Sequence, residues 1–150
     1  MQKSMEHRVV REVMTHRPKT VGPRTDVQTL KAMFEMYEFN AFPVVDEQQI
    51  LVGVVTRLDF LRMFRPDEAH RWIPDLRTLW AERVEDIMSR GLVTVSPEDP
   101  IVMVVDEIVR SKLRSLPVVE RRAGKDVLVG IVTRRDVLKC LTLTEDGSND

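Results

Sequence analysis

The sequence is poor in the residues that mark disulfide frameworks, metal centres and nucleic-acid binding. Its 150 residues include one cysteine, Cys140, and three scattered histidines, so neither an internal disulfide nor a zinc site is expected. Basic and acidic residues nearly cancel, at 23 and 24, which leaves no basic footprint for nucleic acid. No apolar run reaches the roughly 20 residues needed to span a membrane, and no signal-peptide pattern opens the chain. We therefore expect a soluble cytoplasmic protein that folds without a metal.

Motifs for catalysis are missing as well. The sequence contains no nucleophile–base pair and no phosphate-binding loop of the form Gly-x-x-x-x-Gly-Lys-Ser/Thr, so we predict that the chain is not an enzyme. Aromatic residues are few, at 5%, but 43% of the residues are hydrophobic. A core can therefore form mainly from aliphatic side chains.

One seven-residue motif occurs twice and organises the rest of the chain. It reads Gly-Val-Val-Thr-Arg-Leu-Asp from Gly53 to Asp59, and Gly-Ile-Val-Thr-Arg-Arg-Asp from Gly130 to Asp136. Each copy follows an apolar run and leads into another, which predicts a buried strand that ends at the threonine and turns directly into a helix. Such a junction gathers free backbone N–H groups, a hydroxyl and a carboxylate, so it is a candidate site for a small ligand.

The motif lies within a longer repeat. The segment Phe42–Val45 returns 74 residues later as Leu116–Val119, and a longer turn then raises the offset to 77 at the motif. In the first repeat, the pattern predicts a short strand at 19–21, strands at 42–46 and 50–55, and two helices. The first helix is capped by Thr25 or Asp26, and the second begins at Thr56 and is ended by Pro66.

These elements predict an α+β fold of two pseudo-symmetric β-α-β-β-α repeats packed sheet to sheet. A unit of about 55 residues is small for independent stability, so two packed copies bury what neither buries alone. The expected divisions are repeat 1 at 9–66, a connecting helical insert at 67–82, repeat 2 at 83–141 and a polar tail at 142–150. The insert is predicted to be helical because Pro74 suits a first turn and apolar residues follow one helical stripe: Ile73, Leu76, Leu79, Trp80 and Val84.

Taken together, these motifs resemble a tandem pair of CBS domains, the arrangement called a Bateman module. The residues that carry the resemblance are the Phe/Leu-Pro-Val-Val-Asp/Glu strand and the Gly-h-h-Thr-x-x-Asp junction, where h is apolar. The resemblance covers residues 9–64 and 83–141. It implies a regulatory module that binds an adenosine-containing ligand in clefts between the repeats. AMP, ADP and ATP are favoured, and S-adenosylmethionine, NAD(H) and a cyclic dinucleotide stay open. It also implies a homodimer that signals in trans to an unknown protein partner.

The resemblance further implies which side chains hold the ligand. Asp59 and Asp136 would accept hydrogen bonds from both hydroxyls of a ribose, and Thr56 and Thr133 would offer a hydroxyl beside them. Phosphate charge would come from three arginines at the helix starts, namely Arg57, Arg134 and Arg135. The slot for adenine would mix the two repeats. The residues expected to face Asp136 are Met14, Lys19, Phe39 and Asn40, and those expected to face Asp59 are Met88, Val93, Leu113 and Arg114.

The two expected sites differ at the position before the aspartate. Arg135 precedes Asp136, whereas Leu58 precedes Asp59. Because arginine binds phosphate well, we predict that the Asp136 site prefers a phosphorylated nucleotide. The Asp59 site is then expected to bind such a nucleotide more weakly, or to bind a less charged adenosyl group.

Other interpretations stay open from the sequence. Thr-x-x-Asp at the start of a helix is also a capping signature, which can stand alone or coexist with ligand binding. The chain could instead be a dimerising scaffold whose clefts are empty or bind nucleotide weakly. The apolar residues that could supply a dimer contact are Leu30, Phe34, Phe60, Leu61, Val137 and Leu138, and the sequence does not divide them between core and interface.

Overall fold

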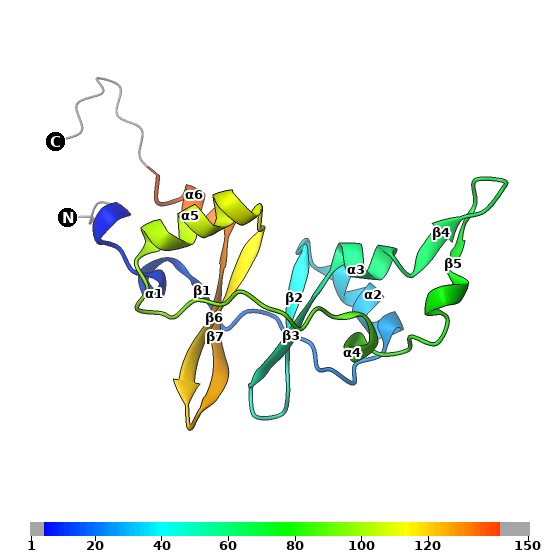
Figure 1. The fold of residues 1–150 in the computed structure, drawn as a ribbon, viewed down its shortest axis with the longest axis horizontal. Coiled ribbons are helices and arrows are strands. Elements are labelled where there is room, and N and C mark those ends of the chain that lie inside the picture. Colours follow the sequence, from blue (N-terminus) through cyan, green and yellow to red (C-terminus); the bar gives the residue numbers. More distant parts are fainter. Residues whose placement is uncertain (1–4, 142–150) are drawn as a thin grey trace, which may run out of the picture. The chain divides into compact units, whose positions relative to one another are not determined.

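The computed structural model describes residues 5–141 and confirms an α+β fold (Figure 1). The predicted tail at 142–150 lies outside the described residues. The described chain forms two compact units, of which unit 1 comprises residues 5–18, 93–121 and 129–141. Unit 2 comprises residues 19–92 and 122–128. We call the first residues of each repeat, 9–18 and 83–92, its lead-in segment. Each unit therefore combines the lead-in segment of one sequence repeat with strands and helices of the other.

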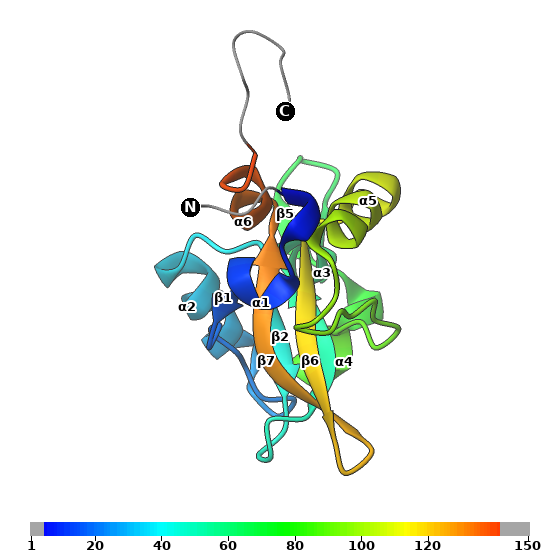
Figure 2. The same cartoon turned by 90° about the vertical axis from the view of Figure 1, so that its left-hand side faces the viewer.

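Unit 1 is built on a three-stranded sheet with the order β1-β7-β6 (Figure 2). The strands are β1 (Thr15–His16), β6 (Ser115–Arg122) and β7 (Lys125–Thr133). β1 runs antiparallel to β7, with Thr15 opposite Ile131 and His16 opposite Gly130. The helical elements are η1 (Met5–His7), α1 (Val10–Val13), α5 (Ile101–Ser111) and α6 (Arg134–Leu138).

The core of unit 1 is aliphatic. α5 buries one face at helical spacing through Ile101, Val104 and Ile108. The lead-in segment joins the same core, because Val10 and Met14 are only 0% and 6% exposed. Full burial of such a side chain contributes about 1.5–3 kcal/mol, so this short segment is held firmly against the sheet.

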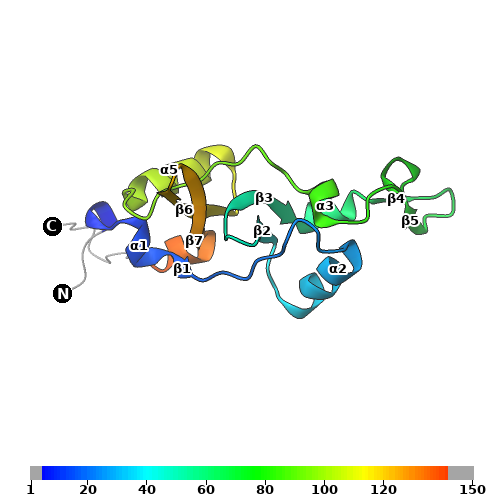
Figure 3. The same ribbon diagram turned by 90° about the horizontal axis from the view of Figure 1, so that it is seen from below.

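Unit 2 contains a second antiparallel pair, β2 (Ala41–Val45) and β3 (Leu51–Thr56), with Phe42 opposite Val55. α2 (Val27–Met36) precedes the pair, and α3 (Arg57–Leu61) follows it directly. Of the two predicted caps, Thr25 and Asp26, the structure selects Asp26, whose carboxylate accepts the backbone N–H of Thr29 at 2.7 Å. Three elements follow, β4 (Phe64–Pro66), β5 (Trp72–Pro74) and η2 (Leu76–Thr78), and α4 (Val84–Ile87) comes after them. Figure 3 shows β4 and β5 beyond the end of α3.

A separate core holds unit 2 together. Its buried members come from α2, β2, β3, α4 and the segment before α2, and they are Val21, Leu30, Phe42, Val44, Val55 and Val84. The strand predicted at 19–21 is reduced to a single parallel bridge between Val21 and Val44. The structure thus assigns Leu30 to the core, whereas Leu61 is 49% exposed.

The predicted connecting helix is wrong. β4 and β5 pair as an antiparallel hairpin, and only a short 3-10 turn, η2, follows it. The residues of the supposed helical stripe remain exposed, with Leu76 at 71% and Trp80 at 66%. A helix gains most of its stability from burying an apolar face, and this stripe buries little. In addition, the Thr78 hydroxyl donates to the Asp75 carbonyl at 3.0 Å, a local bond that competes with helical pairing.

The second helix of the first repeat is also shorter than predicted. α3 ends at Leu61 rather than continuing to Pro66, because Phe64–Pro66 pairs with β5 instead. The ring of Phe64 lies 5.6 Å from that of Phe60, which fixes the strand close to the end of the helix.

Candidate functional site

Both copies of the motif form the predicted junction of strand and helix. In unit 2, the Asp59 backbone N–H donates to Thr56 Oγ1 at 3.0 Å, and Asp59 Oδ2 accepts the Thr56 N–H at 2.8 Å. In unit 1, Asp136 and Thr133 make the same reciprocal bonds, at 3.1 and 3.0 Å. The capping interpretation is therefore correct in both copies. The cap also fixes each carboxylate in one orientation beside a threonine hydroxyl.

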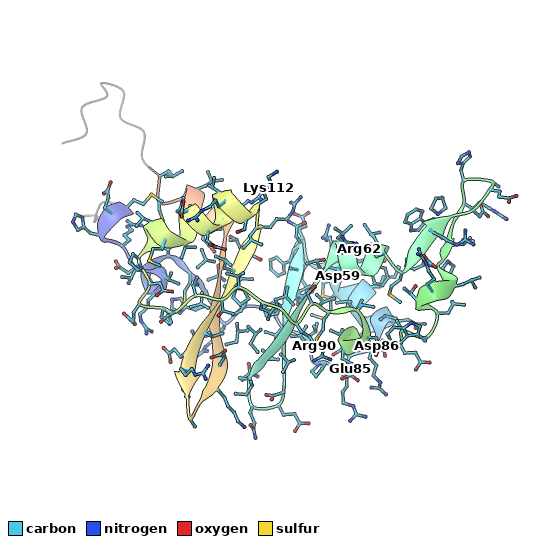
Figure 4. All side chains as sticks on the ribbon, in the orientation of Figure 1. Asp59, Arg62, Glu85, Asp86, Arg90 and Lys112 are labelled. Carbon is cyan, nitrogen blue, oxygen red and sulfur yellow. The ribbon has the colours of Figure 1, made fainter. Side chains whose placement is uncertain are left out.

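The two aspartates differ in their further partners. Thr15 of β1 donates its hydroxyl to the Asp136 carboxylate, with both oxygens at 3.2 Å. Asp59 instead faces a cation, because Arg62 Nη1 lies 3.8 Å from its Oδ1 (Figure 4). Neither partner was predicted from the sequence. The repeat contains a signal for them, since Thr15 aligns with Ser89 at the offset of 74 and Arg62 aligns with Lys139 at the offset of 77.

A methionine packs against the glycine of each motif. A Cβ atom on Gly130 would lie 2.7 Å from Met14 Sδ, and a Cβ atom on Gly53 would lie 2.6 Å from Met88 Sδ. The glycines therefore let the lead-in segments approach the strands closely. In unit 1, Met14 directly precedes Thr15, whose hydroxyl bonds to Asp136. A role for Met14 in a ligand site at Asp136 stays a prediction.

Two of the arginines proposed for phosphate already have partners within their own unit. The Arg57 guanidinium donates to the carbonyls of Phe34 and Tyr37 at 3.2 and 3.1 Å. Arg134 donates to the carbonyls of Leu113 and Lys112 at 2.7 and 3.0 Å. Each arginine thus satisfies carbonyls at the C-terminal end of the preceding long helix, a structural role that competes with binding phosphate.

The third arginine has a different setting. Arg135 is exposed on α6, and at the matching position of α3 the Leu58 side chain is 54% exposed. The residue before each aspartate, Arg135 in one copy and Leu58 in the other, is therefore exposed at the surface in both junctions.

Several of the remaining slot residues lie near the junction of their own unit, whereas no contact within residues 5–141 places Val93 there and it is 47% exposed. The backbone N–H of Arg57 donates to the Asn40 carbonyl at 2.9 Å, and that of Arg134 donates to the Arg114 carbonyl at 3.1 Å. In unit 2, Phe39 is 45% exposed and its ring stacks on Tyr37 at 5.6 Å. Lys19 Nζ lies 5.4 Å from the centre of the same Tyr37 ring. Tyr37 was not among the predicted site residues.

The expected slots draw residues from both units. Met14 shares unit 1 with Asp136, while the other predicted neighbours of Asp136 belong to unit 2: Lys19, Phe39 and Asn40. Met88 shares unit 2 with Asp59, while the other predicted neighbours of Asp59 belong to unit 1: Val93, Leu113 and Arg114. The grouping of these residues around one ligand stays a prediction.

Metal-binding clusters and membrane-spanning helices can be assessed for residues 5–141. Within that range, no three His, Cys, Asp or Glu side chains are grouped so that they could hold a metal ion. None of the helices described there is long and apolar enough to cross a membrane.

Comparison with protein families identifies the family to which the chain belongs. A family model described as CBS domain matches residues 10–65 and 84–143. The chain belongs to the CBS-domain family. The two matched segments confirm the tandem pair inferred from the repeated motifs, and both contain a complete Gly-h-h-Thr-x-x-Asp junction.

Curated relatives include parts of larger enzymes. The chain is 31% identical over 134 residues to homoserine O-acetyltransferase of Methanococcoides burtonii, covering 89% of this chain and 24% of that protein. It is 29% identical over 123 residues to inosine-5′-monophosphate dehydrogenase of Aquifex aeolicus, covering 81% of this chain and 22% of that protein. The chain thus spans about a quarter of the length of both relatives.

Solved structures of CBS-domain pairs share the fold over most of the chain. CBSX2 of Arabidopsis thaliana is 28% identical with a TM-score of 0.71, covering 87% of this chain and 92% of that one. CBSX2 in complex with AMP is 27% identical with a TM-score of 0.72, and the match covers 87% of this chain and 93% of that one. A CBS-domain pair in complex with 5′-methylthioadenosine and S-adenosyl-L-methionine is 22% identical with a TM-score of 0.69. The match covers 88% of this chain and 94% of that one.

Proposed function

We propose that this chain is a non-enzymatic regulatory module that binds an adenosine-containing ligand at its two junctions. The bound state is transmitted through a homodimer to a protein partner. The observation that carries the proposal is the duplicated, capped aspartate beside a threonine hydroxyl, in a chain 27% identical to a protein crystallised with AMP. AMP and related adenosyl compounds are therefore the ligands to test.

The geometry of the carboxylates supports this function. An ionised carboxylate has about four lone-pair sites, and the cap uses one of them on Oδ2 of Asp59. The other oxygen can accept hydroxyl donors such as those of a ribose. The cap also holds the carboxylate in place before ligand arrives, which lowers the entropy cost of binding.

A thermal-shift titration tests the proposal. A ligand that binds only the folded state at a hundred times its Kd stabilises the protein by about 2.7 kcal/mol. For a chain of this length, that stabilisation raises Tm by roughly 5–10 °C. We expect such a rise with at least one of AMP, ADP, ATP, S-adenosylmethionine, 5′-methylthioadenosine and NAD(H), and its loss in the double variant Asp59→Asn/Asp136→Asn.

The substitution and its control are chosen to separate binding from stability. Asparagine keeps an oxygen that accepts the capping N–H, so the ligand-dependent shift can be compared with little change in the fold. Asp106→Asn on α5 is the matched control, since Asp106 is 60% exposed and pairs with Arg110 away from either motif. A ligand shift that survives in the double variant would show that the aspartates do not hold the ligand.

The difference between the junctions leads to a finer proposal about phosphate. We propose that Arg135 gives the Asp136 junction its preference for a phosphorylated nucleotide, because Leu58 occupies the matching place beside Asp59. In the Asp59→Asn variant, AMP should then bind more tightly than adenosine, and adding Arg135→Leu should abolish that preference. Equal affinity for AMP and adenosine before the second change would contradict the proposal.

A second candidate function is a dimerising scaffold with weak or empty nucleotide sites. It is favoured by the exposed leucines of the short junction helices, including Leu61 at 49% and Leu138 at 65%. Sedimentation velocity of the full chain distinguishes the two functions when combined with the titration. A dimer that shows no stabilisation by any adenosyl compound, and that Leu138→Glu dissociates, would favour the scaffold.

A further inference from the structure

The insert between the repeats is attached directly to the helix that carries Asp59. We call residues 64–80, which include β4, β5 and η2, the insert arm. Met63 follows α3 closely, and its carbonyl accepts two bonds from the arm. The donors are the backbone N–H of Asp75 at 2.7 Å and the hydroxyl of Thr78 at 3.1 Å. The contact between the rings of Phe60 and Phe64 adds a third link at the same place.

The insert arm is internally braced. The Asp75 side chain is 4% exposed and accepts the backbone N–H of Arg77 as well as two bonds from its guanidinium, at 3.2 and 2.8 Å. Near the tip, Asp67 accepts the backbone N–H and the guanidinium of Arg71, both at 2.8 Å. Bidentate and charge-assisted bonds of this kind hold an element in one shape. A displacement at Met63 would therefore be passed along the arm rather than absorbed at its base.

A ligand-sensitive contact lies at the base of this arm. Arg62, which precedes Met63, forms an ion pair with Asp59 at 3.8 Å (Figure 4). Its side chain is 68% exposed, whereas that of Asp59 is 11% exposed, so the arginine is the partner free to move. Hydroxyl donors that occupy the Asp59 carboxylate compete with Arg62 for the same oxygen.

We propose that the insert arm reports the occupancy of the Asp59 junction. Ligand at Asp59 weakens the pair with Arg62, and the chain at Met63 shifts together with the arm that is bonded to it. This inference rests on the proposed function, since it requires an adenosyl ligand at Asp59. It adds a structural output that the Asp136 junction does not share, because Asp136 is partnered by the hydroxyl of Thr15.

The chain contains its own reporter for this movement. Its two tryptophans, Trp72 and Trp80, both lie in the insert arm and are 57% and 66% exposed. Trp80 donates its indole N–H to the Arg77 carbonyl at 2.9 Å, so its emission depends on the local shape of the arm. Intrinsic tryptophan fluorescence therefore follows the arm alone.

The experiment uses the full chain with Asp136→Asn, so that only the Asp59 junction is intact. It is titrated with AMP and with 5′-methylthioadenosine, by calorimetry for binding and by tryptophan fluorescence for the arm. Free N-acetyltryptophanamide corrects for absorption by the added nucleoside. We expect a saturable change in emission with the same midpoint as the binding heat. Arg62→Gln should bind ligand at least as tightly, because it removes the competitor for the Asp59 oxygen, and Thr78→Val should keep the binding heat. Each change should reduce or abolish the emission change.

The outcomes separate the two proposals. Saturable binding heat with unchanged emission overturns the reporting role of the arm and leaves ligand binding at Asp59 intact. An undiminished emission change in both Arg62→Gln and Thr78→Val also overturns it, because the proposed links would then be unnecessary. Absence of binding heat with both ligands refutes ligand binding at Asp59 itself, and the inference fails with it. Trp72→Phe and Trp80→Phe identify which side chain responds.

Discussion

The glycine of the second motif provides the sharpest test of the packing around Asp136. In Gly130→Ala, the new Cβ atom would lie 2.7 Å from Met14 Sδ and 2.9 Å from the Thr15 carbonyl oxygen. Both distances are too short for unstrained contact. The thioether can rotate, but the Thr15 carbonyl belongs to β1, which is paired with β7. The substitution must therefore push the lead-in segment away from the sheet.

The expected cost follows from two opposing effects. Overpacking a well-packed position costs about 1–3 kcal/mol. Replacing glycine by alanine also restricts the unfolded chain, which offsets about 0.4–1 kcal/mol of this loss. The free energy of unfolding should therefore fall by roughly 1–2 kcal/mol. For a chain of this length, Tm should fall by about 2–8 °C.

Urea denaturation followed by circular dichroism measures the change, with Gly91→Ala as the matched control. An added Cβ atom at Gly91 meets no atom within 4 Å, so only the restriction of the unfolded chain should remain, a gain in stability of about 0.4–1 kcal/mol. Adding Met14→Ala to Gly130→Ala should cost less than the sum of the single changes, because the smaller side chain removes one of the clashes. If Gly130→Ala and Gly91→Ala were equally stable, close approach of Met14 could not be the reason for the glycine.

Two further predictions concern charged side chains. Hydrogen bonds from the Arg77 side chain and backbone lower the pKa of Asp75 from 3.8 to about 2. The stability that ionised Asp75 contributes is therefore complete at pH values above its pKa in the unfolded chain, and it is lost as the pH falls through its pKa in the folded protein. Asp75→Asn should flatten the acid loss of stability between about pH 4 and pH 2 in urea titrations, and unchanged slopes would contradict this. Arg134→Gln should lower stability by about 1–2 kcal/mol because it removes bonds to two helix-end carbonyls. A loss of AMP affinity without a loss of stability would instead assign Arg134 to phosphate.

Repeated local patterns were the part of the fold that sequence reasoning could predict. Asp26 caps α2 as expected because a cap depends on residues three positions apart. The Thr56–Asp59 junction follows from the same kind of short-range bonding, and a second copy at a fixed spacing made the assignment secure. The adjacent strands were predictable because a continuous apolar run between turn residues has few alternatives.

The insert shows where a local pattern misleads. Apolar residues at helical spacing predict a helix only if a core receives them, and here Leu79 and Trp80 stay 59% and 66% exposed. The bonds that decide the local structure come from Asp75 and Thr78 to nearby backbone. Such side-chain bonds compete with helix formation, and the periodicity of apolar residues does not include them.

Partners of the two aspartates could not be assigned from the motif alone. Thr15 reaches Asp136 only because β1 pairs with β7, a contact between segments far apart in sequence. Arg62 lies three positions after Asp59, a spacing that a helix brings together, but the motif ends at the aspartate and does not include it. The sequence therefore specifies the carboxylates, while the tertiary structure specifies what competes with a ligand for them.

Each junction is completed by the lead-in segment of the other sequence repeat. Asp136 belongs to the second sequence repeat, yet Met14 and Thr15 that contact its surroundings come from the first. Gly53 belongs to the first repeat, yet Met88 that packs on it comes from the start of the second. A fragment cut at the repeat boundaries would retain each aspartate and its cap but lose these neighbours. The structural unit is therefore the exchanged pair, because neither repeat by itself contains the lead-in segment that packs on its own junction.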